Sequence, residues 1–316
     1  MTLFFILSVL QFQSLKLIKT IYVDCGPKSV YYSPDGKYVV ANCLYGNHVD
    51  IIDSEKMKVI RRIPAGGMPV ECDFTQNGRY IWFSLYDKDE VCLYDYFLDS
   101  ILIKIPVGDI PKIVKASPDG KWVYVSNWES ATVSVIDTKK LAVIKEIKVV
   151  RKPRGIVFTP HGKFAYITNM GGGTLTKIDV ENGHKKIKNI SAGITPRHLV
   201  VTKDGRYLYQ TNNLEEVIRK LEIKNDRWMG KAKVGKRART CVLSPDERYL
   251  FVCNYKDNEI GVVDSGEMVQ IYTKKTGNES NGHPIGVTIS PDGKFLWVSN
   301  YRGGVNVYKI VYKEIL

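Results

Sequence analysis

Apolar and polar residues alternate in short runs along most of the chain. Residues 122–127 are Trp-Val-Tyr-Val-Ser-Asn, and after a short polar gap residues 132–137 are Thr-Val-Ser-Val-Ile-Asp. A period of two places successive side chains on opposite faces of a strand, whereas a helix needs apolar residues three and four positions apart. The pattern therefore predicts antiparallel strands that are joined by short loops.

A tight turn precedes each of these strand pairs. At residues 117–120 it is Ser-Pro-Asp-Gly, in which Pro presets φ and Gly supplies a backbone conformation that other residues disfavour. We expect the turn aspartates Asp35, Asp119, Asp246 and Asp292 to accept hydrogen bonds from their own turns.

The turn recurs at an almost constant interval. Related turns occupy residues 33–36, 75–78, 117–120, 159–162, 202–205, 244–247 and 290–293. Successive turns are about 42 residues apart, with one longer step at the end. This period is typical of propeller blades, each a four-stranded meander that buries its faces against its neighbours. The fold class that we predict is all-β, a seven-bladed β-propeller of four-stranded antiparallel blades.

The two ends of the chain complement each other. Inner copies of the repeat end with Ile-x-x-Ile, and a Pro follows six residues later, as at residues 60–63 with Pro69. Residues 18–21 and Pro27 repeat this pattern near the N-terminus. The last copy stops soon after residues 305–310 and lacks a fourth strand. We therefore expect residues 15–23 to complete the last blade and close the ring, because an open propeller would expose a strand edge.

The first 14 residues are interpreted separately from this single domain, residues 15–316. The apolar run at residues 3–10 is too short to span a bilayer and lacks a basic residue before it. Residues 1–14 are a possible signal peptide or an apolar tail packed on the domain. We expect a periplasmic or secreted monomer, with a cytoplasmic location as the alternative.

The net charge is the one unusual feature of the composition. The chain is 44% hydrophobic and 25% charged, as in ordinary globular proteins, but its formal net charge is +13. Such a charge attracts nucleic acid, anionic lipid or acidic polymers, or it serves solubility alone. The cysteines form no Cys-x-x-Cys pair, so we expect them to be small apolar fillers: Cys25, Cys43, Cys72, Cys92, Cys241 and Cys253.

The strand pair at residues 122–137, with its Val-Tyr-Val-Ser-Asn and Thr-Val-Ser-Val-Ile-Asp, resembles the YVTN-type β-propeller repeat. Over residues 15–310 the chain is similar to the YncE-like branch of that group. The resemblance implies a seven-bladed propeller of a kind commonly exported in bacteria. It implies little about activity, because propellers include binding modules, lactone hydrolases and oxidoreductase subunits.

Two positions in the repeat carry candidate binding residues. At one position in the loop that enters each blade, five of seven blades have a basic residue: Lys28, Lys112, Arg154, Arg197 and Arg239. Just after the second strand, four blades have an aromatic residue: Tyr86, Trp128, Tyr255 and Tyr301. Both positions belong to one mouth of the channel, where they would suit an anionic ligand with stackable groups, such as a nucleotide or single-stranded nucleic acid. The alternative is a set of solvated loops with aromatic residues that cap the channel.

Enzymatic motifs are missing from the sequence. It has no Gly-x-Ser-x-Gly, no His-Glu-x-x-His and no glycine-rich phosphate loop after a strand. His48, His198 and His283 could join Glu71 or Asp73 in a metal site, but they belong to different blades. We assign no catalytic residue, metal or cofactor. We expect a non-catalytic binding or scaffold module whose partner is an anionic ligand, a nucleic acid or a protein. The alternative is a lactonase-like hydrolase or a redox-enzyme subunit that uses the same mouth.

Overall fold

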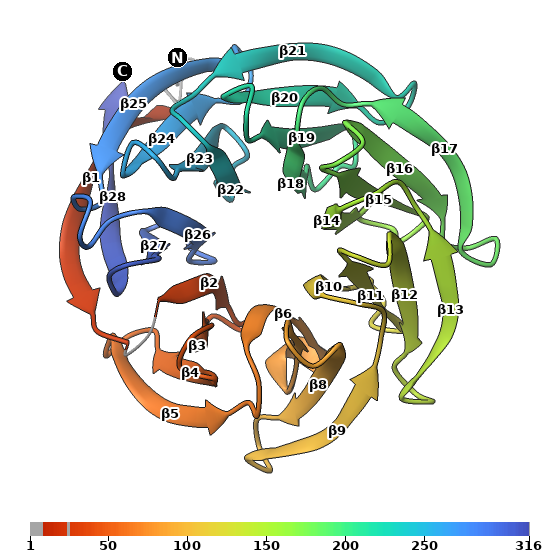
Figure 1. Ribbon diagram of the computed structural model, residues 1–316. Helices are drawn as coiled ribbons and strands as arrows, with labels where there is room; N and C mark the ends of the chain where they lie inside the picture. The colour runs from red at the N-terminus through yellow and green to blue at the C-terminus, as the bar shows by residue number, and fades with distance from the viewer. Residues whose placement is uncertain (1–8, 24–25, 316) are drawn as a thin grey trace, which may run out of the picture.

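The computed structural model describes residues 9–23 and 26–315. Seven four-stranded antiparallel sheets stand as blades around a central axis (Figure 1). The predicted all-β, seven-bladed architecture is confirmed. The described residues include a short 3-10 helix, η1 (Gln76–Gly78), and no helix among them is long and apolar enough to cross a membrane.

The blades follow one another in chain order, and the innermost strand of each comes first, except that the outermost strand of the last blade, β1, begins the chain. Blades 1 to 3 contain β2 (Pro27–Tyr32), β3 (Tyr38–Cys43), β4 (His48–Asp53) and β5 (Lys58–Pro64); β6 (Pro69–Thr75), β7 (Tyr80–Leu85), β8 (Glu90–Asp95) and β9 (Ser100–Pro106); and β10 (Pro111–Ala116), β11 (Trp122–Asn127), β12 (Thr132–Asp137) and β13 (Ala142–Lys148). Blades 4 and 5 contain β14 (Pro153–Phe158), β15 (Phe164–Asn169), β16 (Thr174–Asp179) and β17 (Lys185–Ser191); and β18 (Pro196–Val201), β19 (Tyr207–Asn212), β20 (Val217–Glu222) and β21 (Arg227–Lys233). Blades 6 and 7 contain β22 (Ala238–Leu243), β23 (Tyr249–Asn254), β24 (Glu259–Asp264) and β25 (Val269–Lys275); and β26 (Pro284–Ile289), β27 (Phe295–Asn300), β28 (Val305–Ile315) and β1 (Val9–Ile21).

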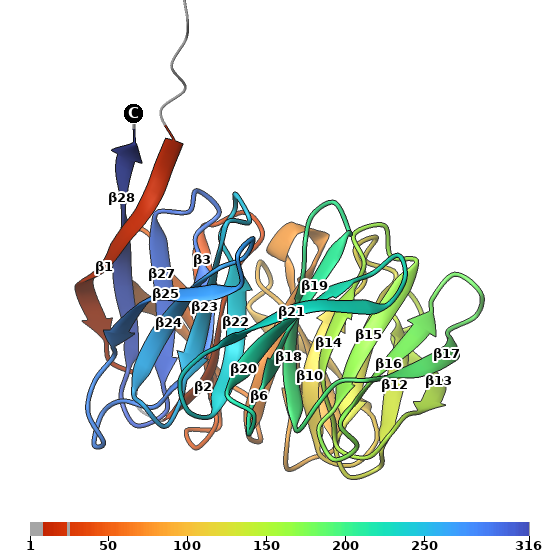
Figure 2. The same ribbon diagram turned by 90° about the horizontal axis from the view of Figure 1, so that it is seen from above.

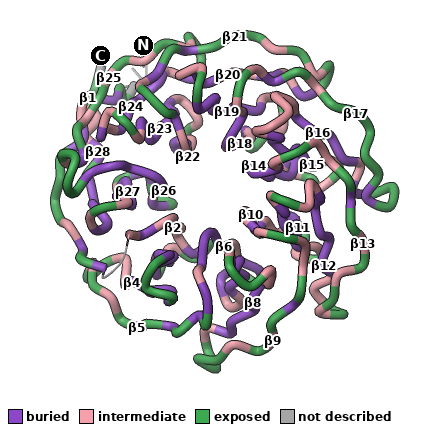
Figure 3. Tube along the Cα trace, in the orientation of Figure 1, coloured by how far each residue is buried: buried purple, intermediate pink, exposed green. Residues whose placement is uncertain are grey.

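The hydrophobic core lies between neighbouring blades. Trp82 of blade 2 packs in one buried cluster with Val114 and Val123 of blade 3. The two middle strands of a blade are therefore covered on both faces, whereas the outermost strands alternate between exposed and partly buried residues (Figure 3). No blade could bury its faces alone, which accounts for the strict repetition of the pattern along the chain.

The N-terminal strand closes the ring as predicted. β1 pairs antiparallel with β28, with Leu15 opposite Ile310 and Ile21 opposite Val305. The strand begins at Val9, so the boundary that we placed between residues 14 and 15 falls inside it. β1 and β28 extend together beyond the disc (Figure 2). Cleavage of residues 1–14 as a signal peptide stays a prediction.

The turn aspartates accept hydrogen bonds within the turns that follow the innermost strands. Ser117 Oγ and the Lys121 amide both donate to Asp119 Oδ1, at 2.7 and 3.1 Å. The same pair of hydrogen bonds forms at Asp35, Asp246 and Asp292. Gly120 completes its turn with φ +69°, a conformation that favours glycine. These turns define one face of the disc, and the starts of the inner strands define the other.

Candidate functional site

Five basic side chains come from equivalent positions on the strands that line the channel. Each is the second residue of its strand in β2, β10, β14, β18 or β22: Lys28, Lys112, Arg154, Arg197 and Arg239. We call these five residues the basic cluster. Burial lowers the pKa of Lys28 well below its usual value, and the nearby charges of Arg154, Arg197 and Arg239 lower it further. The structure therefore brings residues from five blades together at one end of the channel.

The two arginines of blades 4 and 5 are buried inside the channel. Arg154 is 6% exposed and Arg197 is 9% exposed. The alternative interpretation, in which these positions lie in solvated loops, is therefore wrong for Arg154 and Arg197. Burial lowers the pKa of Arg197 well below its usual value, and the nearby charges of Arg154 and Arg239 lower it further.

The basic cluster is poorly neutralised by the residues around it. Glu71 is 5% exposed, and its carboxylate accepts hydrogen bonds from Tyr31 Oη at 2.7 Å and Arg154 Nη2 at 3.3 Å. Among the described residues, the contact of the Arg197 guanidinium is Met170 Sδ at 3.8 Å, and Arg239 Nε is buried without a hydrogen-bond partner. One buried carboxylate thus faces several cations.

Burial lowers the pKa values of the cluster, and for four of its members neighbouring positive charges lower them further. Burial lowers the pKa of Lys112 to about 7, and the positive charges of Arg154 and Arg197 contribute. Burial and Arg154 lower the pKa of Arg239 to about 10. A bound anion would favour the charged forms of these groups and reverse both shifts.

The predicted aromatic residues pack against the cations of the cluster. Lys112 Nζ lies 3.7 Å from the ring centre of Tyr86, and Arg239 Cζ lies 3.8 Å from that of Tyr255. Lys28 Nζ is 5.4 Å from the Tyr301 ring, and the Trp128 ring is 5.5 Å from both Lys112 and Lys152. The rings stabilise the cations, because a ring face attracts a desolvated positive charge. Alternation of basic groups and flat rings around a ligand stays a prediction.

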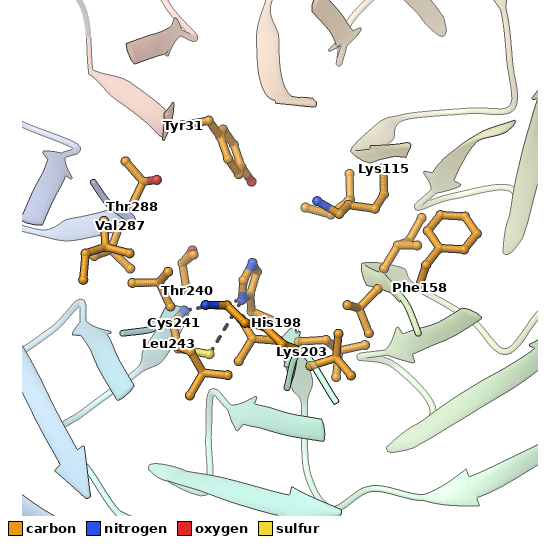
Figure 4. Close-up of a pocket in the computed structure, with 18 of the residues that line it drawn as sticks. Tyr31, Lys115, Phe158, His198, Lys203, Thr240, Cys241, Leu243, Val287 and Thr288 are labelled. Atoms are coloured by element: carbon orange, nitrogen blue, oxygen red, sulfur yellow. Dashed lines mark hydrogen bonds between the residues drawn. The ribbon is translucent and has the colours of Figure 1, made fainter. Parts of the chain in front are cut away.

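A cavity that our sequence analysis missed occupies the other half of the channel. It has a volume of about 730 Å³ and reaches the Ser-Pro-Asp-Gly turns. Its walls are mainly apolar residues from the second halves of the inner strands, with His198 and Lys115 among them (Figure 4). The signal for it was the run of apolar residues at the ends of these strands, such as residues 156–158 and 199–201.

The histidines do not meet in a shared site. His198 lies in the cavity, where burial and nearby positive charges lower its pKa to about 3 and keep it neutral. His283 Nδ1 contacts the Tyr255 carbonyl at 3.1 Å. His48 packs against Asp50 within blade 1. The considered metal site of histidines with Glu71 or Asp73 is therefore not assembled in the described part of the chain.

Comparisons with known proteins agree with this architecture. The family model described as "Lactonase, 7-bladed beta-propeller" matches residues 106–300, and the model described as "Cytochrome D1 heme domain" matches residues 6–109. No curated protein sequence gives a significant match.

Among solved structures, the chain is similar to one described as Kuenenia stuttgartiensis hydrazine synthase. The two share 20% sequence identity and superpose with a TM-score of 0.82, over 91% of this chain and 97% of that chain. At this identity the likeness shows the fold. The lactonase match covers more than half of the sequence, and the chain therefore belongs to the lactonase family of seven-bladed β-propellers.

Proposed function

We propose that this protein is a non-catalytic binding module that takes a compact anion at the basic cluster. The observation that carries the proposal is the buried excess of positive charge around Arg154, Arg197 and Arg239, with Glu71 as its buried carboxylate. Burying charges without partners is costly, and an anion would supply charge-assisted hydrogen bonds to several of them at once.

The burial of the arginines favours a compact ligand over a polymer. Arg154 and Arg197 are less than a tenth exposed, so a ligand must enter the channel to reach them. Lys112 covers one face of the Tyr86 ring, and Arg239 covers one face of the Tyr255 ring. A phosphate or carboxylate group can enter such a site, whereas a single strand of nucleic acid could present only its end.

Calorimetric titration with pyrophosphate at low salt tests the proposal. Arg197→Gln removes a buried charge whose side chain has a single weak contact, so the fold should be retained. We expect its affinity to fall by about ten-fold or more, equivalent to about 1.4 kcal/mol. Arg227→Gln, which removes an equal charge from exposed β21, is the control and should change affinity by less than about two-fold. Equal effects of the two variants, or no binding by the unaltered protein, would contradict the proposal.

Hydrolysis of an anionic lactone is the second candidate function. It is favoured by the family match and by Glu71, a carboxylate within the basic cluster that could activate water beside cations able to stabilise an oxyanion. In a pH-stat assay, lactones with and without an anionic substituent would be compared. Turnover that requires the anionic substituent and is abolished in Glu71→Gln would favour the enzyme over the binding module.

The YVTN-type motif of the blades supports a place with the YncE-like propellers and an exported location. The apolar run at residues 3–10 is the further support for export. Cell fractionation, combined with mass determination of the mature N-terminus, checks this part of the proposal.

A further inference from the structure

Blade 1 differs from blades 3 and 4 at three adjacent positions. In blade 3 these positions hold Asn127, Thr132 and Ser134, and the Asn127 amide donates to both hydroxyls at 2.9 and 2.8 Å. Blade 4 repeats the arrangement with asparagine and two threonines. The strand register places Cys43, His48 and Asp50 at the same positions in blade 1. All three replacements are residue types that ligate metal ions.

The replaced residues are buried and close together. Cys43 and Asp50 are 0% exposed and His48 is 7% exposed. Cys43 Sγ lies 3.9 Å from Asp50 Oδ2, and His48 Nε2 lies 3.4 Å from Asp50 Oδ1. One ligand atom from each of the three residues lies within 4.8 Å of the other two. Zinc bonds of 2.0–2.3 Å in a tetrahedron separate ligand atoms by about 3.3–3.8 Å, so small side-chain adjustments would bring all three onto one ion.

The surroundings orient these groups as a metal site requires. His48 Nδ1 lies 3.0 Å from the Gly46 carbonyl, which selects the tautomer with hydrogen on Nδ1 and leaves the Nε2 lone pair facing Asp50. Arg62 donates to both oxygens of Asp50, at 2.9 and 3.1 Å, and fixes the carboxylate plane. Such outer contacts to a ligating histidine and carboxylate are typical of metal centres.

The geometry points to a structural metal site in blade 1, in which Cys43, His48 and Asp50 bind one Zn²⁺. Thiolate, imidazole and carboxylate are all zinc ligands, and a water or another group of the chain completes four-fold coordination. None of the three residues belongs to the basic cluster, and a metal here would tie β3 to β4 next to the start of β2. Its function would be to stabilise blade 1, which adjoins the blade that closes the ring.

Metal analysis of the untagged full chain, purified from zinc-supplemented cells, tests this site. We expect about one zinc per chain by elemental mass spectrometry. The triple variant Cys43→Asn, His48→Thr, Asp50→Ser carries the residues of blade 3 and should fold, as checked by circular dichroism, yet hold almost no zinc. Cys92→Ser removes another buried cysteine, in blade 2, and should keep the full content.

Cobalt substitution provides a second readout that does not depend on the triple variant. The Co²⁺ protein should show a thiolate-to-metal charge-transfer band, which Cys43→Ser abolishes and Cys92→Ser preserves. Absence of zinc and cobalt binding by the unaltered chain would overturn the inference. So would full zinc content in the folded triple variant, or a disulfide that engages Cys43 in the isolated protein.

Discussion

Lys112 gives the basic cluster a pH dependence in the neutral range. Burial and the charges of Arg154 and Arg197 lower its pKa to about 7, so the side chain is charged below this pH and neutral above it. Anion affinity should therefore fall as the pH rises through about 7. Pyrophosphate titrations at about pH 6 and pH 8 measure the change. Lys112→Arg keeps its charge throughout, and its affinity should vary less; an equal pH dependence in both proteins would refute the role of Lys112.

Asp119 stabilises a turn at the face of the disc opposite to the basic cluster. Partial burial raises its pKa, but hydrogen bonds from Ser117 and Lys121 outweigh this, and the net pKa lies below the usual value. Its stabilisation is thus present above about pH 4 and is lost as the pH falls through the folded-state pKa. Asp119→Ala should lower the free energy of unfolding by about 1 kcal/mol in urea denaturation. Weaker anion binding without this loss would mean that the two faces are assigned the wrong way round.

β1 is the element on which closure of the ring depends, and its first half contributes to the core. Phe12 is 8% exposed and packs against Tyr249 and Phe251 of blade 6. Phe12→Ala should cost about 3 kcal/mol of stability. Leu10, which is 50% exposed, is the matched control, and Leu10→Ala should change stability by about 0.5 kcal/mol or less. Similar small effects in both variants would show that residues 9–14 do not stabilise the folded protein.

The net charge of +13 is a property of the whole molecule, whereas we propose that anions bind at the basic cluster alone. If only the end of a single-stranded nucleic acid enters the channel, a plot of log affinity against log salt concentration should have a slope no steeper than about −2. This slope should not depend on the length of the nucleic acid. Titration of fluorescent oligonucleotides of two lengths at several salt concentrations measures the slope. A slope that steepens with length would show that the strand follows a wider basic surface.

Much of this architecture could be predicted because each blade repeats the same short sequence motifs. The Ser-Pro-Asp-Gly turns and the Ile-x-x-Ile strand identified seven blades and the strand that closes them. The start of β1 could not be predicted in this way. A β-bulge between Phe12 and Ser14 breaks the period of two, so the buried Phe12 and Leu15 are three residues apart.

The members of the basic cluster could also be inferred, because equivalent strand positions meet at one end of the channel. Their burial and their contacts with rings could not, since these depend on the channel width and on side-chain conformations. The three blade 1 positions were missed for a different reason. The histidines belong to different blades and therefore indicate no shared site. The signal lies within blade 1, where Cys43, His48 and Asp50 replace the Asn, Thr and Ser of blade 3.

Anomalous diffraction from crystals soaked in tungstate tests the central claim most directly. Tungstate is a compact oxyanion whose metal can be located without prior phases. Anion binding at the basic cluster predicts one dominant anomalous peak among Arg154, Arg197 and Arg239, and the peak should disappear in Arg197→Gln crystals. Peaks confined to exposed lysines, or to the cavity near the Ser-Pro-Asp-Gly turns, would contradict the account.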